Sequence, residues 1–525
     1  QGRHDKVEPL YKRSLAIREK ALGAEHPDVA ASLGNLAALY ETLGRYDEAE
    51  PLYRHSLAIR EKALGRDHPD VAGSLKNLAE LYRAQARYGD AEILFRRSLA
   101  IRERALGTEH QDVATSLSGL ASVHYQQGRY SEAEPLFTRA LAIFEKALGR
   151  NHTSVAVALN NLAQMSQFRG DLGRAERLNK RALAILEDVR GPDHEDVARS
   201  LVNLALLHGS QGRFGEAEPL IKRALAISEK VYGPEHVNVG GTLRSLAGLY
   251  RAQGRMGEVE ALYQRALAIT EKALGPDHPR VASALNDLAE LYSIEGRYGP
   301  SEQLHIRALA ITEKALGPEH PLLGASLNNL AGVYMKQGRY GEAEPLFKRS
   351  LAIKEKTHDP GHHVLSIAFN NLAKLYWYQG RYSEAAPLYK RSLAIDDKAL
   401  RPDHPSIART LDNLAVLYRD QGKHDLALKY FRRASAIHRD RAVRAGGGRS
   451  AGGLSEQRKA RKVFMHHLRA TLEKPTDNPT ARGALTGEGF AAGQLANATS
   501  AGAAVARMAA RFASGDDKVA VLMRR

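Results

Sequence analysis

One short turn sequence, Gly-Arg-Tyr or a close variant, returns every 42 residues along most of this 525-residue chain. The eleven turns begin at residues 2, 44, 86, 128, 170, 212, 254, 296, 338, 380 and 422, with no slip in register. A fixed period of this length is typical of a solenoid, in which each unit packs on its neighbours. Such a fold offers a long surface and usually no enclosed active site, so the period favours binding over catalysis.

Each unit reads as two helices joined by a tight turn. From Val29 to Tyr40 the apolar residues recur with the spacing of one helix face, and Gly44 then breaks the helix. A second helix is predicted from about Tyr46 to Leu64, with Gly65 as a left-handed C-terminal cap. Neither helix alone buries its apolar face, so the sequence predicts that stacked hairpins share one core.

The repeat is irregular near its two ends. Asp359 and Arg401 replace the glycine that ends the other second helices, so we expect those two loops to be built differently. Residues 3–22 read as a second helix whose first helix is missing, which predicts a fragment truncated on its N-terminal side, because a native solenoid is expected to begin with a polar capping helix. Ten complete hairpins follow, at residues 28–64, 70–106, 112–148, 154–190, 196–232, 238–274, 280–316, 322–358, 364–400 and 406–440.

Several positions of the unit carry a family pattern. Leu36-Ala37, Tyr40, the turn at 44–46, Ala49 and Tyr53 follow the pattern of tetratricopeptide (TPR) repeats. The usual period is shorter, and this 42-residue form resembles the repeats of kinesin light chains and related bacterial TPR proteins. The resemblance implies an all-α fold, a right-handed TPR superhelical solenoid of helix-turn-helix hairpins.

The resemblance predicts three regions. A TPR array covers residues 1–440, with a partial unit at 1–27 and ten hairpins at 28–440. A segment rich in Gly, Ser and Arg at 441–455 predicts a flexible linker. Residues 456–525 are predicted to be a small helical tail that leads into a further C-terminal domain, with one helix at about 456–472, a loop at 475–479, and a second helix from about Gly489 to Ala513.

The Ala-rich stretch from Ala496 to Phe512 has a resemblance of its own. It is similar to the helical segment that joins a TPR array to a CHAT domain, a caspase-like peptidase module, in bacterial TPR-CHAT proteins. The resemblance implies that a longer protein carries a peptidase after Arg525. The sequence contains no cysteine, so a cysteine nucleophile does not lie in this chain.

Composition excludes several classes of function. Without cysteine there is no disulfide and no Cys-ligated zinc. We find no apolar run long enough to span a membrane and no signal peptide, which predicts a soluble, cytoplasmic protein without a membrane partner. The net charge of +16 is spread too thinly over the repeats to predict nucleic-acid binding by itself. We find no catalytic constellation and no cofactor motif, so the chain is predicted not to be an enzyme and to need no cofactor.

A recurrent asparagine is the main candidate for a binding site. Asn is a middling helix former, so its return at one position of the first helix needs a reason. In TPR groove binders and kinesin light chains this position bonds the backbone of a bound peptide, and an amide suits that task because it both donates and accepts. The alternative is that each Asn bonds a neighbouring helix and stabilises the stack. With three variable basic neighbours, the predicted groove consists of Asn35, Asn77, Asn161, Asn203, Asn329, Asn371, Asn413, Lys76, Arg244 and Lys374.

Two other columns are open to a simpler explanation. A histidine stands at the start of all ten hairpins, from His26 to His404, but stacked helices are about 8–10 Å apart. Neighbouring members therefore cannot share a metal ion, whose ligand atoms lie about 2 Å away, and we favour a role at the helix start. An arginine returns on the second helices from Arg97 to Arg433. We interpret that row as a solvated outer face paired with nearby Glu, with phosphate tracking as the alternative.

These observations predict a protein-interaction scaffold that binds extended peptide segments of a partner in its concave groove. The resemblances imply that it is the sensor or regulatory part of a larger TPR-CHAT protein. A first alternative is a cargo adaptor like kinesin light chains, which would need a heptad coiled coil that we do not find. A less favoured alternative is a repeat protein that binds nucleic acid through its basic rows and tail. The identity of the partner is not encoded in any motif that we find.

Overall fold

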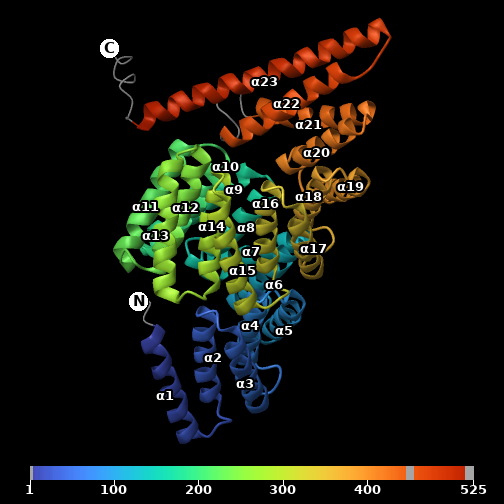
Figure 1. Ribbon diagram of the computed structural model, residues 1–525. Coiled ribbons are helices and arrows are strands. Elements are labelled where there is room, and N and C mark those ends of the chain that lie inside the picture. The colour runs from blue at the N-terminus through green and yellow to red at the C-terminus, as the bar shows by residue number, and fades with distance from the viewer. Residues whose placement is uncertain (1–3, 445–453, 515–525) are drawn as a thin grey trace, which may run out of the picture. The chain divides into compact units, whose positions relative to one another are not determined.

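A computed structural model describes residues 4–444 and 454–514 of the chain. Within these ranges every regular element is an α-helix, and there are 23 of them (Figure 1). They are α1 (His4–Leu22), α2 (Pro27–Thr42), α3 (Tyr46–Leu64), α4 (Pro69–Ala84), α5 (Tyr88–Leu106), α6 (Gln111–Gln127), α7 (Tyr130–Leu148), α8 (Thr153–Phe168), α9 (Leu172–Arg190), α10 (Glu195–Ser210), α11 (Phe214–Tyr232), α12 (Val237–Gln253), α13 (Met256–Leu274), α14 (Pro279–Ile294), α15 (Tyr298–Leu316), α16 (Pro321–Lys336), α17 (Tyr340–Thr357), α18 (His363–Tyr378), α19 (Tyr382–Ala399), α20 (Pro405–Asp420), α21 (His424–Arg444), α22 (Leu454–Glu473) and α23 (Pro479–Ser514).

The helices pack in consecutive pairs, α2 with α3 and α4 with α5, as the hairpin prediction requires. The chain forms two compact units. Unit 1 comprises residues 1–203, 223–244 and 260–362, and unit 2 comprises residues 204–222, 245–259 and 363–525. The all-helical hairpin fold predicted from the 42-residue period is thereby confirmed.

The core of each hairpin combines small and large side chains. Ala37 on α2 and Ala49 on α3 are fully buried, which lets the two helices approach closely, and Tyr40 and Tyr53 fill the space beside them. This core extends into the next hairpin without a break, because Leu78 on α4 belongs to the same apolar cluster. The packing explains why single hairpins recur as a stack.

The recurrent histidine begins the first helix of each hairpin. The Nδ1 atom of His26 accepts a hydrogen bond of 3.2 Å from the backbone N–H of Asp28, and His68 does the same for Asp70. This bond satisfies one of the backbone donors that a helix start leaves without an intrahelical partner. The same bond is made by His110, His152, His194, His236, His278, His320 and His404. The role at the helix start is thus confirmed for these nine histidines.

The glycines that end the second helices differ from the prediction. Gly65 has φ 86° and ψ 154°, which is not the left-handed helical conformation that we expected but an extended one with positive φ. Only glycine adopts that region readily. The left-handed helical cap occurs instead at the tight turn, where Gly128 has φ 85° and ψ 8°. The loops at Asp359 and Arg401 are built differently, as predicted, because α17 and α19 end one residue earlier.

The arginine of the repeated turn joins three elements. The guanidinium of Arg87 lies 3.9 Å from the centre of the Tyr82 ring, 2.9 Å from Glu50 of the preceding second helix and 2.8 Å from Asp90. The Tyr82 hydroxyl donates to the same Glu50 carboxylate at 3.1 Å. Burial alone would raise the pKa of Glu50, but Arg87, Tyr82 and Arg54 outweigh it and the pKa is lowered. We call this contact the turn hub.

Turn hubs recur along both units. In unit 1 the equivalent arginines are Arg45, Arg297 and Arg339, each above a tyrosine ring and paired with a glutamate of the preceding second helix. In unit 2 Arg255 makes the same contacts with Tyr250 and Glu218. The feature that returns every 42 residues is therefore the point where one hairpin is tied to the next.

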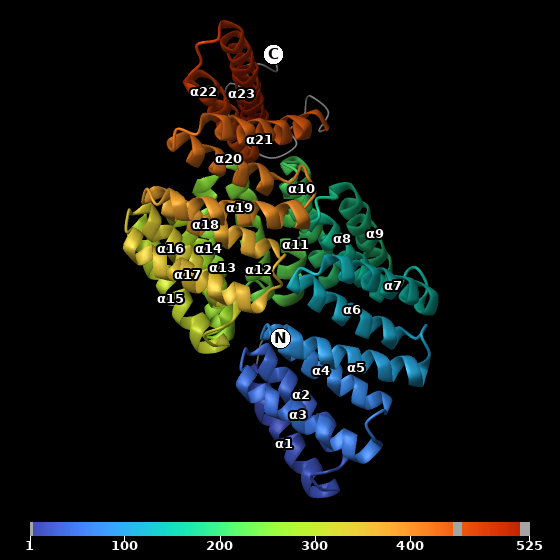
Figure 2. The same ribbon diagram turned by 90° about the vertical axis from the view of Figure 1, so that its right-hand side faces the viewer.

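The tail continues as a hairpin after the array. Helix α22 packs on α21, and α22 and α23 lie side by side in both views (Figures 1 and 2). Arg432 on α21 forms a two-bond ion pair with Glu488 on α23, with both distances 2.7 Å. The loop predicted at residues 475–479 ends at Asn478 in the structure. The predicted start of the second tail helix at about Gly489 is wrong, because α23 already begins at Pro479, where Asn478 Oδ1 accepts the Thr480 N–H at 2.9 Å.

The part of the predicted linker that falls on residues 445–453 lies outside the described residues, and so does the C-terminal end at 515–525. No helix within the described ranges combines the length and the hydropathy that a membrane span requires.

Breaking one turn hub should weaken the array. We expect Arg87→Ala to lower the free energy of unfolding by about 1–2 kcal/mol, because it removes a cation–π contact and two ion pairs. Urea titration followed by circular dichroism measures the change. The matched control is Arg66→Ala, at an exposed side chain in the loop between α3 and α4, just before the hairpin that contains Arg87. Equal stability of the two variants would contradict the role of the hub.

We expect the free energy of unfolding to fall in acid, because several histidines are buried in the folded chain. Burial lowers the pKa of His305, His404 and His438 to about 4, from an ordinary value of 6.5. The folded chain therefore binds fewer protons than the unfolded chain, so their contribution is complete above about pH 6.5 and is lost as the pH falls towards 4. Each group adds a slope of at most about 1.4 kcal/mol per pH unit.

The check is urea titration at several pH values between 7 and 4. We expect His305→Gln to reduce the pH dependence of stability in that window. A pH dependence that the substitution leaves unchanged would show that His305 does not titrate in this way.

Candidate functional site

The first helices of neighbouring hairpins contact one another directly. In unit 1 these contacts join α2 with α4, α4 with α6 and α14 with α16, and in unit 2 they join α18 with α20. Successive second helices form no contact of comparable extent from α3 to α9 or between α15 and α17 in unit 1, nor between α19 and α21 in unit 2. Because the closer row of a curved stack lies on its inner side, the first helices line the inner side of each unit.

All ten residues of the predicted groove lie on first helices. Eight of the ten hairpins contribute one or two of them, so the structure distributes these side chains along the row and does not gather them into a single pocket. Unit 1 holds Asn35, Asn77, Asn161, Asn203, Asn329, Lys76 and Arg244, and unit 2 holds Asn371, Asn413 and Lys374.

None of the seven asparagines is fully buried. Asn35 and Asn329 are exposed, and the other five are half-buried. Their amides therefore lie at the surface of the row, which is the placement that contact with a bound peptide requires. The use of these amides in binding a peptide stays a prediction.

Two slots of the column bond to neighbouring first helices. Asn413 donates through Nδ2 to Asn370 Oδ1 at 3.0 Å, and Asn370 donates in turn to Thr410 Oγ1 at 2.9 Å. In unit 1 Asp287 fills the asparagine slot of α14 and pairs with Arg244 at 2.5 Å. Asn413 thus fits the alternative of a stacking role, and the charge of Arg244 is neutralised within the row.

The slot one residue before the asparagine column also carries polar side chains on most first helices. The sequence analysis named only Lys76 and Arg244 of this slot and missed its asparagines, of which Asn286 is the clearest in unit 1. Asn286 donates to Ser326 Oγ on the next first helix at 3.2 Å and lies 2.8 Å from His305 Nδ1. The available signal was the pair of adjacent asparagines in this slot and the next, as at Asn370 and Asn371.

The arginine row on the second helices is neutralised by the preceding hairpin. Arg139 lies 2.7 Å from Glu103, and Arg181 lies 2.6 Å from Glu145. The same pairing, between one second helix and the one before it, is made by Arg97, Arg223, Arg265, Arg307, Arg349 and Arg433. The interpretation of this row as an outer face paired with acidic residues is confirmed for these positions.

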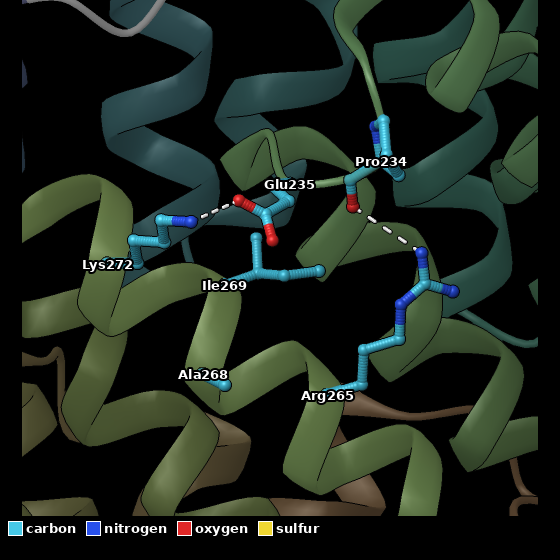
Figure 3. Close-up of a pocket in the computed structure, with 6 residues that line it drawn as sticks. All are labelled: Pro234, Glu235, Arg265, Ala268, Ile269 and Lys272. Atoms are coloured by element: carbon cyan, nitrogen blue, oxygen red, sulfur yellow. Dashed lines mark hydrogen bonds and ion pairs between the residues drawn. The ribbon is translucent and has the colours of Figure 1, made fainter.

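A shallow cavity of about 270 Å³ lies on the same outer face in unit 1 (Figure 3). Arg265 donates to the Pro234 carbonyl at 3.4 Å, and Lys272 pairs with Glu235. These polar groups already form contacts between adjacent hairpins, so we interpret the cavity as a gap between repeats and not as a ligand site. Among the residues described, no three His, Asp or Glu side chains are gathered where they could hold a metal ion.

Comparison with solved structures gives partial matches. One is the crystal structure of BtubC (BKLC) from P. vanneervenii, which is 27% identical, covers 44% of this chain and 93% of that chain, and has a TM-score of 0.38. Another is a Podosopora anserina putative kinesin light chain with nearly identical TPR-like repeats, 31% identical over 39% of this chain and 97% of that chain, with a TM-score of 0.34. A search of curated proteins finds no match.

A family model described as tetratricopeptide repeat matches the chain in overlapping segments. The segments are residues 1–62, 35–104, 70–146, 112–188, 154–230, 196–271, 238–314, 294–356, 322–398 and 365–440. Together they span residues 1–440, and the five that begin between residues 70 and 238 start 42 residues apart, which is the period of the hairpins. The chain therefore belongs to the tetratricopeptide repeat family.

Proposed function

We propose that this chain is a protein-interaction scaffold that holds an extended segment of a partner along its row of first helices. The observation that carries the proposal is the asparagine column, whose amides lie exposed or half-buried on the inner side of each unit. Membership of the TPR family supports protein binding in general. No feature described above supports catalysis by this chain.

The amides suit a peptide backbone because each offers one acceptor and a donor group. The backbone N–H and C=O groups of a bound segment would form hydrogen bonds with the asparagine amides of successive hairpins, and these bonds would not depend on the side chains of the segment. The neighbouring slots vary, with Lys76 beside an ion pair of Glu80 and Arg83 (2.8 Å) on α4. These variable side chains would choose among partner sequences.

The members of the column are not equivalent in this proposal. Asn35 and Asn329 are exposed in unit 1, and Asn77 lies beside Lys76. Asn413 already donates to Asn370. We therefore assign the backbone contacts in unit 1 to Asn35, Asn77 and Asn329, and we assign Asn413 chiefly to the stack.

The proposal extends to a longer protein. The resemblance of residues 496–512 to the segment that precedes a CHAT domain supports a role as the sensor part of a bacterial TPR-CHAT protein. Binding of the partner would then control an attached peptidase in the cytoplasm. The full reading frame tests this part: a downstream domain with a His/Cys dyad is expected, and a different domain would contradict it.

The groove is tested with a library of random peptides displayed on phage and selected against the purified chain. We expect enriched peptides whose affinity falls roughly tenfold or more in Asn35→Ala/Asn77→Ala/Asn329→Ala, because three hydrogen bonds of about 1 kcal/mol each are removed. Isothermal titration calorimetry measures the affinities.

Gln264→Ala is the matched control, since Gln264 is an exposed amide on the second helix α13. It should leave the affinity unchanged. Enriched peptides that bind the triple variant and the parent equally, or a selection that enriches none, would contradict the groove.

A further inference from the structure

Two helix-start histidines of unit 1 contact hairpins that lie 236 residues earlier in the chain. The Nε2 atom of His278, before α14, is 3.4 Å from the carbonyl oxygen of Thr42 at the end of α2. The Nε2 atom of His320, before α16, is 3.1 Å from the carbonyl oxygen of Ala84 at the end of α4. Both contacts therefore join the start of a late first helix to the end of an early one.

The cap fixes the direction of these bonds. Nδ1 of His278 accepts the backbone N–H of Arg280 at 3.0 Å, and Nδ1 of His320 accepts that of Leu322 at 3.1 Å. Nδ1 is then unprotonated, so in the neutral ring Nε2 carries the hydrogen and donates it. The receiving carbonyls belong to the last turn of a helix, where carbonyls have no intrahelical donor. One imidazole thus caps two helices.

Burial separates these histidines from equivalent ones. His278 and His320 are buried, whereas His26, His68 and His110 are half-buried. All five make the same cap bond. The contact with the early hairpins is what distinguishes the buried pair.

The irregular loop after α17 makes a third contact of the same kind. The ring of His362 lies so close to Gly128 that a Cβ atom there would be 2.5 Å from Cδ2. Asp359, which replaces the usual glycine, lies 3.9 Å from Arg129. His358 also meets Tyr88, with ring centres 6.4 Å apart. These contacts explain why the sequence of this loop differs from that of the equivalent loops in other repeats.

We propose that these contacts form a releasable clasp that closes unit 1 on itself. The clasp consists of His278 on Thr42, His320 on Ala84, and the loop at 358–362 on Tyr88 and on residues 128–130. It consists of a few hydrogen bonds, one ion pair and ring contacts, whereas adjacent hairpins share continuous apolar cores. Because solenoid units otherwise contact only their neighbours, the clasp opens without unfolding any hairpin. Opening changes the access of a ligand to the first helices of unit 1.

The test uses substitutions that keep the caps. In His278→Asn/His320→Asn the shorter side chain still caps the helix, because Asn is a favoured N-cap residue, but it cannot reach the early hairpin. The matched control is His26→Asn/His68→Asn, at two caps without a long-range partner among the bonds described. Circular dichroism should show the same helix content in both variants.

Distances across the clasp report its state. The sequence has no cysteine, so Asp47→Cys with Asp277→Cys gives two unique sites for nitroxide labels in the full chain. We expect pulsed electron–electron double resonance to show a longer and broader distance in His278→Asn/His320→Asn, and the parent distance in the control. A distance unchanged by His278→Asn/His320→Asn, or lengthened equally by the control, would overturn the clasp.

Discussion

The turn hub is the interaction on which the solenoid depends. Its arginine is held above the tyrosine of its own first helix and reaches the glutamate of the preceding second helix, as Arg45 does with Tyr40 and Glu8. One side chain thereby fixes the turn within a hairpin and the register between hairpins. The apolar cores supply most of the driving force for stacking, since burial of such surface dominates folding, but apolar contacts are not directional and would tolerate slippage that the hub forbids.

Much of the fold could be predicted from the sequence because its determinants are local. Helix bounds followed from apolar spacing and from the turn at Gly44, and α3 begins and ends at the predicted residues Tyr46 and Leu64. The conformation of Gly65 was predicted wrongly, because a glycine in a sequence indicates a positive φ without specifying ψ. The start of α23 at Pro479 was missed because the helix was predicted only from about Gly489, where the sequence becomes Ala-rich.

The candidate site could be predicted only in part. The placement of the asparagines on first helices follows from the repeat register, but their hydrogen-bond partners do not. The bond from Asn413 to Asn370 depends on the distance between two stacked helices, and no property of either residue alone reveals it. The contact of His320 with Ala84 was equally hidden, because it joins segments 236 residues apart.

The clasp also bears on how such an array evolves. Arg139 pairs with Glu103 and Arg181 with Glu145 at the same spacing, so loss or duplication of one whole unit restores these contacts at the new junction. The loop at 358–362 has no such freedom, because its irregular sequence matches one particular early turn, at Gly128. If one repeat were added or removed between Gly128 and this loop, the loop would face a different turn, with which its contacts could not form. The contacts between adjacent hairpins are therefore compatible with any number of repeats, whereas the contacts that close unit 1 require one particular number.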